Sequence, residues 1–251
     1  MSNNKRRMTM QYLIRVLILG FIGVSTSFAN SSEVPILGKT ITQAKQQQMT
    51  PKQALQRLKE GNQRFLTNTQ VTRDYLKQAH QSSYGQYPFA VVLNCMDSRS
   101  VPELFFDQGL ADLFTLRVAG NVLNDDILGS MEFATKVTGS RLIVVLAHTS
   151  CGAVAGACSG VQLGHLTDVL DKIKPVVQES MDEQKTKNCA DPKLIDAIAK
   201  ANALRIVREI QNRSPIINDL ISKKQIGIVA GVHDIKTGKV EFFEEERSVP
   251  H

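Results

Sequence analysis

Two short clusters in this 251-residue sequence contain residue types that bind metals or act as nucleophiles. The first reads Cys-Met-Asp-Ser-Arg over residues 95–99, and the second reads His-Thr-Ser-Cys-Gly over residues 148–152. Two thiolates and one imidazole are ligands that zinc prefers, and a site with three protein ligands leaves one position open for water. Cys95, His148 and Cys151 together therefore predict a catalytic zinc site.

Each of these residues also has an ordinary structural explanation when it is taken alone. Cysteine is one of the most buried residue types, a single histidine is often a hydrogen-bonded interior group, and Asp97 is suited to cap a loop. Their joint occurrence favours the metal site. In that site Asp97 can reach the metal or its water, and Arg99 can hold the carboxylate in a two-pronged pair that lowers its pKa.

The elements that must position these clusters alternate between strands and helices. Short apolar runs predict buried strands over residues 88–93, 113–119 and 141–147, and a closing strand pair over 226–232 and 239–243. Capping signals and helical spacing predict helices over residues 50–68, 73–82, 125–138, 152–158, 163–181, 192–212 and 215–223.

This order predicts an α/β fold, in which a mainly parallel central sheet is flanked by helices and preceded by an amino-terminal helical arm. Each cluster follows a predicted strand directly. In a parallel sheet both clusters lie at the carboxyl ends of strands, where open α/β sheets place their functional sites. The two clusters can therefore meet in space although they are far apart in the sequence.

Residues 1–29 have the features of a signal peptide: a basic start at residues 5–7, an apolar run over 16–24, and the small residues Ser27 and Ala29. An uncleaved anchor helix is the alternative, but the run is shorter than the roughly 20 residues that a bilayer requires. We expect an exported, periplasmic protein with no stable membrane association after cleavage. Residues 30–49 are then a flexible arm, 50–246 the catalytic domain and 247–251 a tail.

Composition is typical of a soluble globular protein, with 42% hydrophobic and 22% charged residues. The formal net charge of +6 falls to +2 without the predicted leader, which holds four of the 30 basic residues and none of the 24 acidic ones. No nucleic-acid partner is expected from so small a charge. Cys158 and Cys189 remain after the metal takes its ligands. An oxidising compartment could link them, but we expect free thiols because Cys158 falls in a helix that faces the core.

The motifs Cys-x-Asp-Ser-Arg and His-x-x-Cys-Gly resemble those of the β-class carbonic anhydrases, zinc enzymes that interconvert CO2 and bicarbonate. Residues 58–65, 112–121 and 227–240 are also similar to segments of that family, so the resemblance covers residues 50–245. It implies a homodimer or homotetramer that hydrates CO2 by a zinc-bound hydroxide.

The resemblance also implies roles for individual residues. Cys95, His148 and Cys151 are the implied ligands of Zn²⁺, Asp97 and Arg99 are the implied catalytic dyad, and Gln86, Phe114 and Gly152 are the implied substrate-binding residues. Zinc lowers the pKa of a bound water to about 7, which supplies hydroxide at ordinary pH. Asp97 is expected to accept its hydrogen bond and orient it.

The sequence departs from the family at two points and leaves other activities open. His233 stands where the family often has tyrosine and is not expected to be a ligand; the chain also has no Trp, so the family's Trp-containing second bicarbonate site is not expected in its usual form. The same ligands suit a hydrolase of CS2 or carbonyl sulfide. They also suit a non-catalytic zinc or redox-sensing protein with Asp97 as fourth ligand, or a thiol hydrolase using Cys151 or Cys95.

Overall fold

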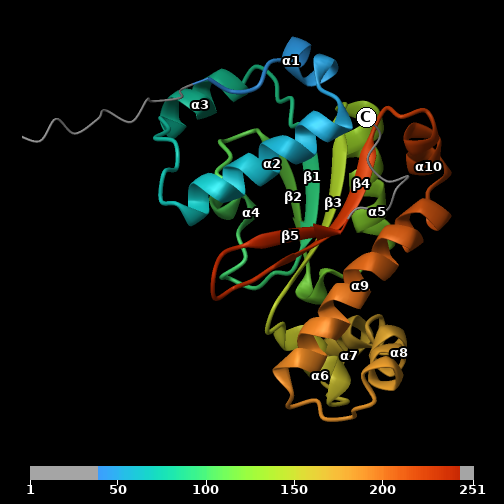
Figure 1. The fold of residues 1–251 in the computed structure, drawn as a ribbon. Helices are drawn as coiled ribbons and strands as arrows, with labels where there is room; N and C mark the ends of the chain where they lie inside the picture. Colours follow the sequence, from blue (N-terminus) through green and yellow to red (C-terminus); the bar gives the residue numbers. More distant parts are fainter. Residues whose placement is uncertain (1–38, 244–251) are drawn as a thin grey trace, which may run out of the picture. The chain divides into compact units, whose positions relative to one another are not determined.

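The computed structural model describes residues 39–243, which fold around one five-stranded sheet in the order β2-β1-β3-β4-β5 (Figure 1). The strands are β1 (Ala90–Asn94), β2 (Leu113–Arg117), β3 (Leu142–His148), β4 (Gly227–His233) and β5 (Val240–Phe243). The first four strands are parallel, and β5 pairs antiparallel with β4. The mainly parallel α/β fold expected from the sequence is therefore confirmed.

The helices flank this sheet and connect its strands. They are α1 (Gln43–Gln48), α2 (Pro51–Leu66), α3 (Tyr75–Ser82), α4 (Pro102–Phe105), α5 (Asp125–Glu132), α6 (Gly152–Cys158), α7 (Gly164–Asp171), α8 (Lys174–Gln184), α9 (Pro192–Arg213) and α10 (Pro215–Ser222). A 3-10 turn spans Ala119–Asn121, and a π-helical turn spans Phe133–Val137. None of the helices within residues 39–243 combines the length and the apolar character that crossing a bilayer requires.

Both faces of the sheet are covered, which explains why its strands are almost continuously apolar. In β1, Val91 and Leu93 face a core built with α5, α6, α8 and α9. Ala90 and Val92 face a second core, built with α2 and α4. Alternate residues of each strand thus supply opposite cores, as the period of a strand requires.

Capping residues fix where the major helices begin. Thr50 accepts a hydrogen bond from the Gln53 backbone, and the Gln53 side chain accepts one from the Thr50 N–H, which forms a capping box at the start of α2. At the start of α9 the Asp191 side chain accepts from the Lys193 N–H, and Pro192 occupies the first helical position. Both starts agree with the sequence expectation.

Two expected elements differ in the structure. The helix expected over residues 163–181 is two helices, α7 and α8, because Pro175 disfavours continuation of the first helix and fits the first turn of the second. The expected flexible arm includes α1, whose Gln46 is buried and donates to the carbonyls of Pro88 and Thr138. The predicted signal peptide (1–29) and tail (247–251) lie outside the described residues.

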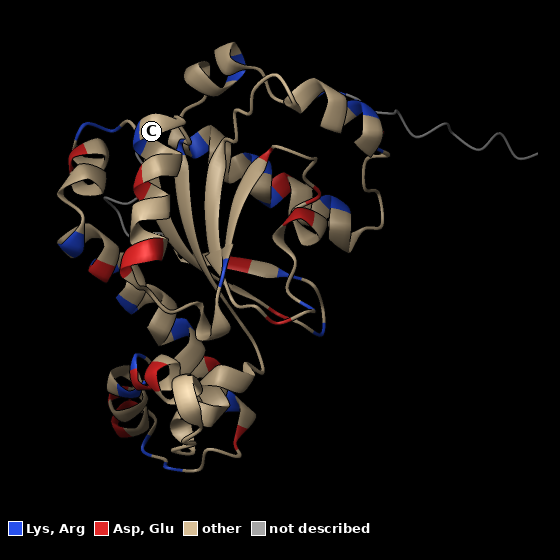
Figure 2. Cartoon of the chain, turned by 180° about the vertical axis from the view of Figure 1, so that it is seen from behind, with Lys and Arg blue, Asp and Glu red and all other residues tan. Residues whose placement is uncertain are grey.

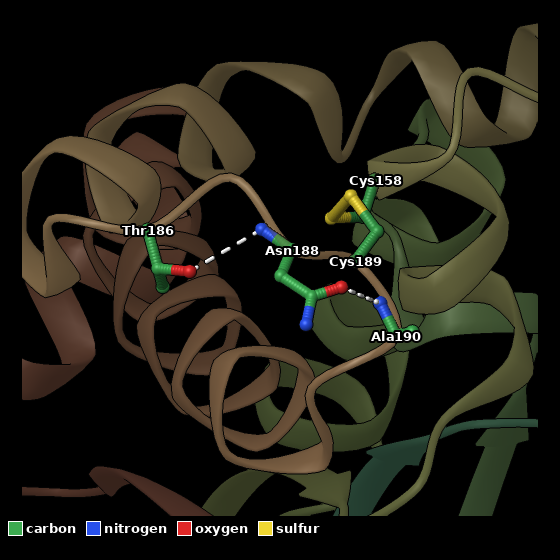
Figure 3. The surroundings of a disulfide bond; sticks show 5 residues. All are labelled: Cys158, Thr186, Asn188, Cys189 and Ala190. Carbon is green, nitrogen blue, oxygen red and sulfur yellow. Dashed lines mark hydrogen bonds between the residues drawn. A yellow bond between two sulfur atoms is a disulfide. The ribbon is translucent and has the colours of Figure 1, made fainter.

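The expectation of free thiols at Cys158 and Cys189 is wrong, because the two residues form a disulfide (Figure 3). Cys158 is the last residue of α6 and is only partly buried. Its side chain is therefore not enclosed in the core and bonds to Cys189, in the segment that precedes α9. Two local hydrogen bonds order that segment: Asn188 N–H donates to Thr186 Oγ1, and Ala190 N–H donates to Asn188 Oδ1. Cys95 and Cys151 remain free.

Basic and acidic residues occur along the same helices (Figure 2). On α9, Arg205 and Arg213 both pair with Glu209, each one helical turn away. Glu209 therefore interacts with two basic side chains of the same helix, one turn to either side.

Candidate metal centre

Three metal-binding side chains meet at the carboxyl ends of β1 and β3. Cys95 follows the last residue of β1, His148 is the last residue of β3, and Cys151 is the N-cap of α6. The turn between His148 and Cys151 is closed by Ser150, which adopts a left-handed conformation with φ of 56°. The ligand atoms of the three residues all lie within 4.8 Å of one another. The structure thus brings together the three ligands expected from the sequence.

His148 has the orientation of a metal ligand. Its Nδ1 lies 2.9 Å from the Thr149 carbonyl, which can only accept a hydrogen bond, so Nδ1 carries the proton and Nε2 holds a free electron pair. Nε2 is buried and has no hydrogen-bond partner within residues 39–243. A buried, unpaired nitrogen beside two sulfur atoms fits a divalent cation such as zinc, because cation binding would satisfy it.

The sulfur atoms of Cys95 and Cys151 lie within 4.8 Å of each other. The Cys151 thiol donates a hydrogen bond to Cys95 Sγ, which lowers the pKa of Cys95 and raises the pKa of Cys151. The backbone N–H groups of Asp97 and Gly120 also point at the Cys95 sulfur and favour its thiolate. Thiolate character at this position suits a metal ligand.

Asp97 and Arg99 form the two-pronged pair expected from their spacing. Arg99 Nε donates to Asp97 Oδ1 at 3.0 Å and Nη2 donates to Oδ2 at 2.8 Å, while the Arg99 backbone N–H donates to Oδ1 at 3.0 Å. These bonds hold the pKa of Asp97 well below its usual range. Asp97 Oδ2 also lies 3.9 Å from His148 Nε2. An ionised carboxylate is therefore held beside the three ligands by an arginine.

Further residues that hold this site were not identified from the sequence. The Arg117 side chain donates to the carbonyl of Asp97 at 2.7 Å and to that of Cys95 at 3.3 Å, so it fixes the loop that carries both residues. The Gly120 N–H donates to Cys95 Sγ at 3.3 Å. Arg117 and Gly120 both belong to the segment 112–121. The similarity of this segment to the family was the only sequence feature that could have indicated their role.

The structure separates the three expected substrate-binding residues. Gly152 directly follows Cys151 and begins α6, where its N–H has no carbonyl of the helix to pair with. Phe114 pairs with Val91, four residues before Cys95, and is therefore about 13 Å from the ligands along the strand direction. Gln86 precedes β1 and lines a pocket at the edge of the sheet where the parallel strands begin. Gln86 and Phe114 thus lie away from the ligands of their own chain.

His233 lies next to the centre without joining it. It pairs with His148 across β3 and β4, stacks on Phe105 and places Nδ1 3.3 Å from Ser100 Oγ. Burial lowers the pKa of His233 to about 4. It also lines a pocket of about 260 Å³ together with Arg99. A neutral, buried imidazole at this position suits a residue that supports the metal centre without binding the metal.

Comparisons with known proteins identify similar sequences. The sequence model of the carbonic anhydrase family matches residues 90–240. Carbonic anhydrase 2 of Mycobacterium tuberculosis is 32% identical over 195 residues, which cover 75% of this chain and 91% of that protein. The carbonic anhydrase of Mycolicibacterium smegmatis is 32% identical over 197 residues, covering 76% and 92% of the two chains.

Solved structures show the same fold. The β-carbonic anhydrase CcaA superimposes with a TM-score of 0.62 at 24% identity, covering 76% of this chain and 95% of that one. A structure from a study of two tetrameric β-carbonic anhydrases of Sordaria macrospora gives a TM-score of 0.62 at 22% identity, covering 66% and 86%.

Proposed function

This chain belongs to the β-carbonic anhydrase family, and on that premise we propose that it catalyses the reversible hydration of CO2 to bicarbonate and a proton. In this proposal Cys95, His148 and Cys151 hold a zinc ion. The observation that carries it is the convergence of three buried ligand atoms, one of them the unpaired His148 Nε2, beside the Asp97 carboxylate.

The proposed roles follow from the contacts of each residue. A zinc ion in a site with one open position supplies a nucleophile from water at neutral pH. Asp97 accepts a hydrogen bond from the attacking water and so directs its lone pair towards CO2, while Arg99 keeps the carboxylate ionised and turned towards the water. The Gly152 N–H is free to donate to an oxygen of the substrate or product.

Gln86 and Phe114 can serve this reaction only from another subunit, because both lie at the far end of the strands from their own ligands. We therefore propose a homodimer or homotetramer. Support comes from β2, an edge strand of the sheet whose Phe114 packs against the half-exposed Phe133 of the adjoining π-helical turn. Light scattering that shows only a species of about 25 kDa at working concentration would contradict this proposal.

We also propose that the protein is exported to the periplasm. Support comes from the amino-terminal features of the sequence and from the Cys158–Cys189 disulfide, since disulfides persist in oxidising compartments. Amino-terminal sequencing of protein recovered from a periplasmic extract tests both the compartment and cleavage after Ala29.

The central experiment measures zinc stoichiometry and CO2 hydration on the same sample. We expect about one zinc per chain, and loss of both metal and activity in Cys95→Ser, His148→Ala and Cys151→Ser. His165→Ala is the matched control, because His165 is fully exposed on α7 and has no part in the site. Full activity in a metal-free sample would refute the zinc site, and full zinc without CO2 hydration would redirect the proposal to hydrolysis of CS2 or carbonyl sulfide.

A further inference from the structure

We propose that helix α9 holds the metal ligands in position through two polar side chains, Asn202 and Asp196. This inference rests on the zinc site proposed above. Neither side chain is a ligand: Asn202 acts through the backbone of Gly120, and Asp196 acts through the backbone of Ser150. Both are positioning residues, one for Cys95 and the other for the turn that joins His148 to Cys151.

Asn202 connects the interior of the protein to the Cys95 sulfur. Its side chain is fully buried, and its Nδ2 donates to the Gly120 carbonyl at 3.1 Å. Its Oδ1 accepts from Arg205 Nη2 at 3.3 Å, which fixes the orientation of the amide. On the opposite side of the same residue, the Gly120 N–H donates to Cys95 Sγ at 3.3 Å. Asn202 therefore holds the peptide that follows Gly120, and the peptide that precedes Gly120 contacts the Cys95 sulfur.

The position of Asn202 in the sequence also argues for a specific role. It interrupts the apolar face formed by Ile195, Ala199, Ile206 and Ile210, all of which are buried. A buried amide in a helix destabilises the core unless its hydrogen bonds are satisfied, so an apolar residue would pack here without that requirement. The geometry thus points to Gly120 as the reason for an amide.

Asp196 holds the second ligand turn. Its Oδ1 accepts from the Ser150 N–H at 2.8 Å, and Asp196 is only half-buried. Ser150 has a φ of 56°, a left-handed conformation that is unfavourable for residues other than glycine. This conformation lets the chain turn back between His148 and Cys151. The carboxylate stabilises the turn by pairing the N–H that the conformation presents.

One rigid element thereby fixes loops that follow different strands. The two side chains lie six residues apart on α9, which corresponds to about 9 Å along a helix axis. The Gly120 loop follows β2, and the Ser150 turn follows β3. Because both loops are attached to the same helix, the spacing between Cys95 and the pair His148 and Cys151 is set by α9 as well as by the sheet.

The test of Asn202 compares two variants of the zinc-loaded mature chain. Asn202→Leu keeps the approximate size of the side chain and removes the donor. Ile206→Val is the control, because Ile206 is equally buried one turn away and has no polar contact. We expect zinc to be released to a chromogenic chelator about tenfold faster from Asn202→Leu than from wild type, as for other residues that support metal ligands, and at the wild-type rate from Ile206→Val.

Cobalt substitution provides a readout that a change in stability alone would not move. The thiolate-to-cobalt absorption band reports the hydrogen bonding and position of the cysteine sulfurs. It is expected to shift in Asn202→Leu and to stay unchanged in Ile206→Val. Wild-type release and an unshifted band in Asn202→Leu would overturn the role of Asn202.

Asp196 allows the same test at a half-exposed position, where a folding failure is not expected. Asp196→Ala removes the acceptor, whereas Asp196→Asn retains an oxygen that can accept from the Ser150 N–H. We expect faster zinc release from Asp196→Ala and recovery of slow release in Asp196→Asn. Equal release from Asp196→Ala and wild type would overturn this half of the proposal. Should the wild type bind zinc but not hydrate CO2, the proposed function fails while the release data still decide the role of α9.

Discussion

Replacing Gly120 by alanine tests whether the Gly120 loop is as tightly constrained as its contacts indicate. Gly120 has a φ of 65°, and a Cβ added there would lie 2.6 Å from Ile173 Cδ1 and 3.3 Å from Ala153 Cβ. The left-handed conformation costs a residue with a Cβ about 1–2 kcal/mol, and overpacking a buried site costs about 1–3 kcal/mol. We expect Gly120→Ala to lower the free energy of unfolding by about 2–5 kcal/mol, from the sum of these two effects.

A double-mutant cycle with Ile173→Val separates the two contributions. Ile173 is fully buried, and its valine variant lacks the Cδ1 atom that the new methyl group would meet. Ile173→Val alone is expected to cost about 0.5–1.5 kcal/mol. The double variant should be more stable than the sum of the single effects predicts, because the clash is absent while the backbone strain remains.

Urea unfolding of the metal-free proteins is the appropriate assay, since zinc bound to the folded state would add its own stabilisation. Gly129→Ala is the matched control: Gly129 lies in α5, and no heavy atom lies within 4 Å of its added Cβ. That substitution should stabilise the helix by about 0.5–1 kcal/mol. A Gly120→Ala protein as stable as Gly129→Ala, or strict additivity with Ile173→Val, would refute the reasoning.

Three further predictions concern the site and its surroundings. Asp97→Asn should keep zinc but lose much of the CO2 hydration rate, because the carboxylate no longer orients water. Metal analysis and a stopped-flow assay of the same sample check this. Unimpaired hydration at full zinc occupancy would leave Asp97 without its proposed role. Replacing Cys158 and Cys189 by serine should lower the free energy of unfolding by about 3–4 kcal/mol, since the disulfide spans 31 residues of sequence. An unfolding midpoint in urea that is the same for both proteins would contradict this. The third prediction concerns pH. The pKa of His233 is about 4 in the folded protein, mainly through burial, against about 6.5 for an unperturbed histidine. As the pH falls, the unfolded chain binds the proton before the folded protein does. The stability that neutral His233 contributes is therefore complete above about pH 6.5 and is lost as the pH falls towards 4. Unfolding of His233→Gln should show a shallower loss of stability over this range, and an equally steep loss would argue against His233 as its source.

The sequence was sufficient to predict the sheet and the cluster of Cys95, His148 and Cys151 because both depend on short, local patterns. Paired valines and leucines marked β1 and β3 as buried strands, and the carboxyl ends of parallel strands meet at one edge. That rule places the two clusters at one edge, and the ligand chemistry of thiolates and imidazole selects Cys95, His148 and Cys151 within them. The geometry of Asp97 and Arg99 was also accessible, since the two residues are only two positions apart.

Contacts between distant segments were not accessible in this way. The partner of Asn202 is a carbonyl 82 residues earlier in the sequence, and no local pattern specifies it. The interruption of an apolar helix face was a signal only that Asn202 has some buried partner. The positions of Gln86 and Phe114 required the register of β1 and β2, which places Phe114 opposite Val91 and not opposite Cys95.

The disulfide was not predicted because it depends on the direction in which the Cys158 side chain leaves the last turn of α6. Cys158 has the spacing of a core residue, yet it lies at the last position of the helix and only part of it is buried. The sequence already placed Cys189 between two expected helices, but which segment lies beside it depends on tertiary packing that no local pattern specifies.

The coexistence of this disulfide with two reduced cysteines in the proposed metal site restricts how the protein can mature. Four cysteines allow three complete pairings, and the described residues contain one disulfide, while Cys95 and Cys151 stay unoxidised with their sulfur atoms within 4.8 Å of each other. Cys151 is also only seven residues from Cys158, so an oxidant acting on the unfolded chain has several wrong partners to join. Once folded, Cys95 and Cys151 are 5% and 1% exposed, which shields them from thiol–disulfide exchange. Folding that encloses Cys95 and Cys151 early therefore favours the correct disulfide, and misoxidised chains are the expected by-product when folding is slow.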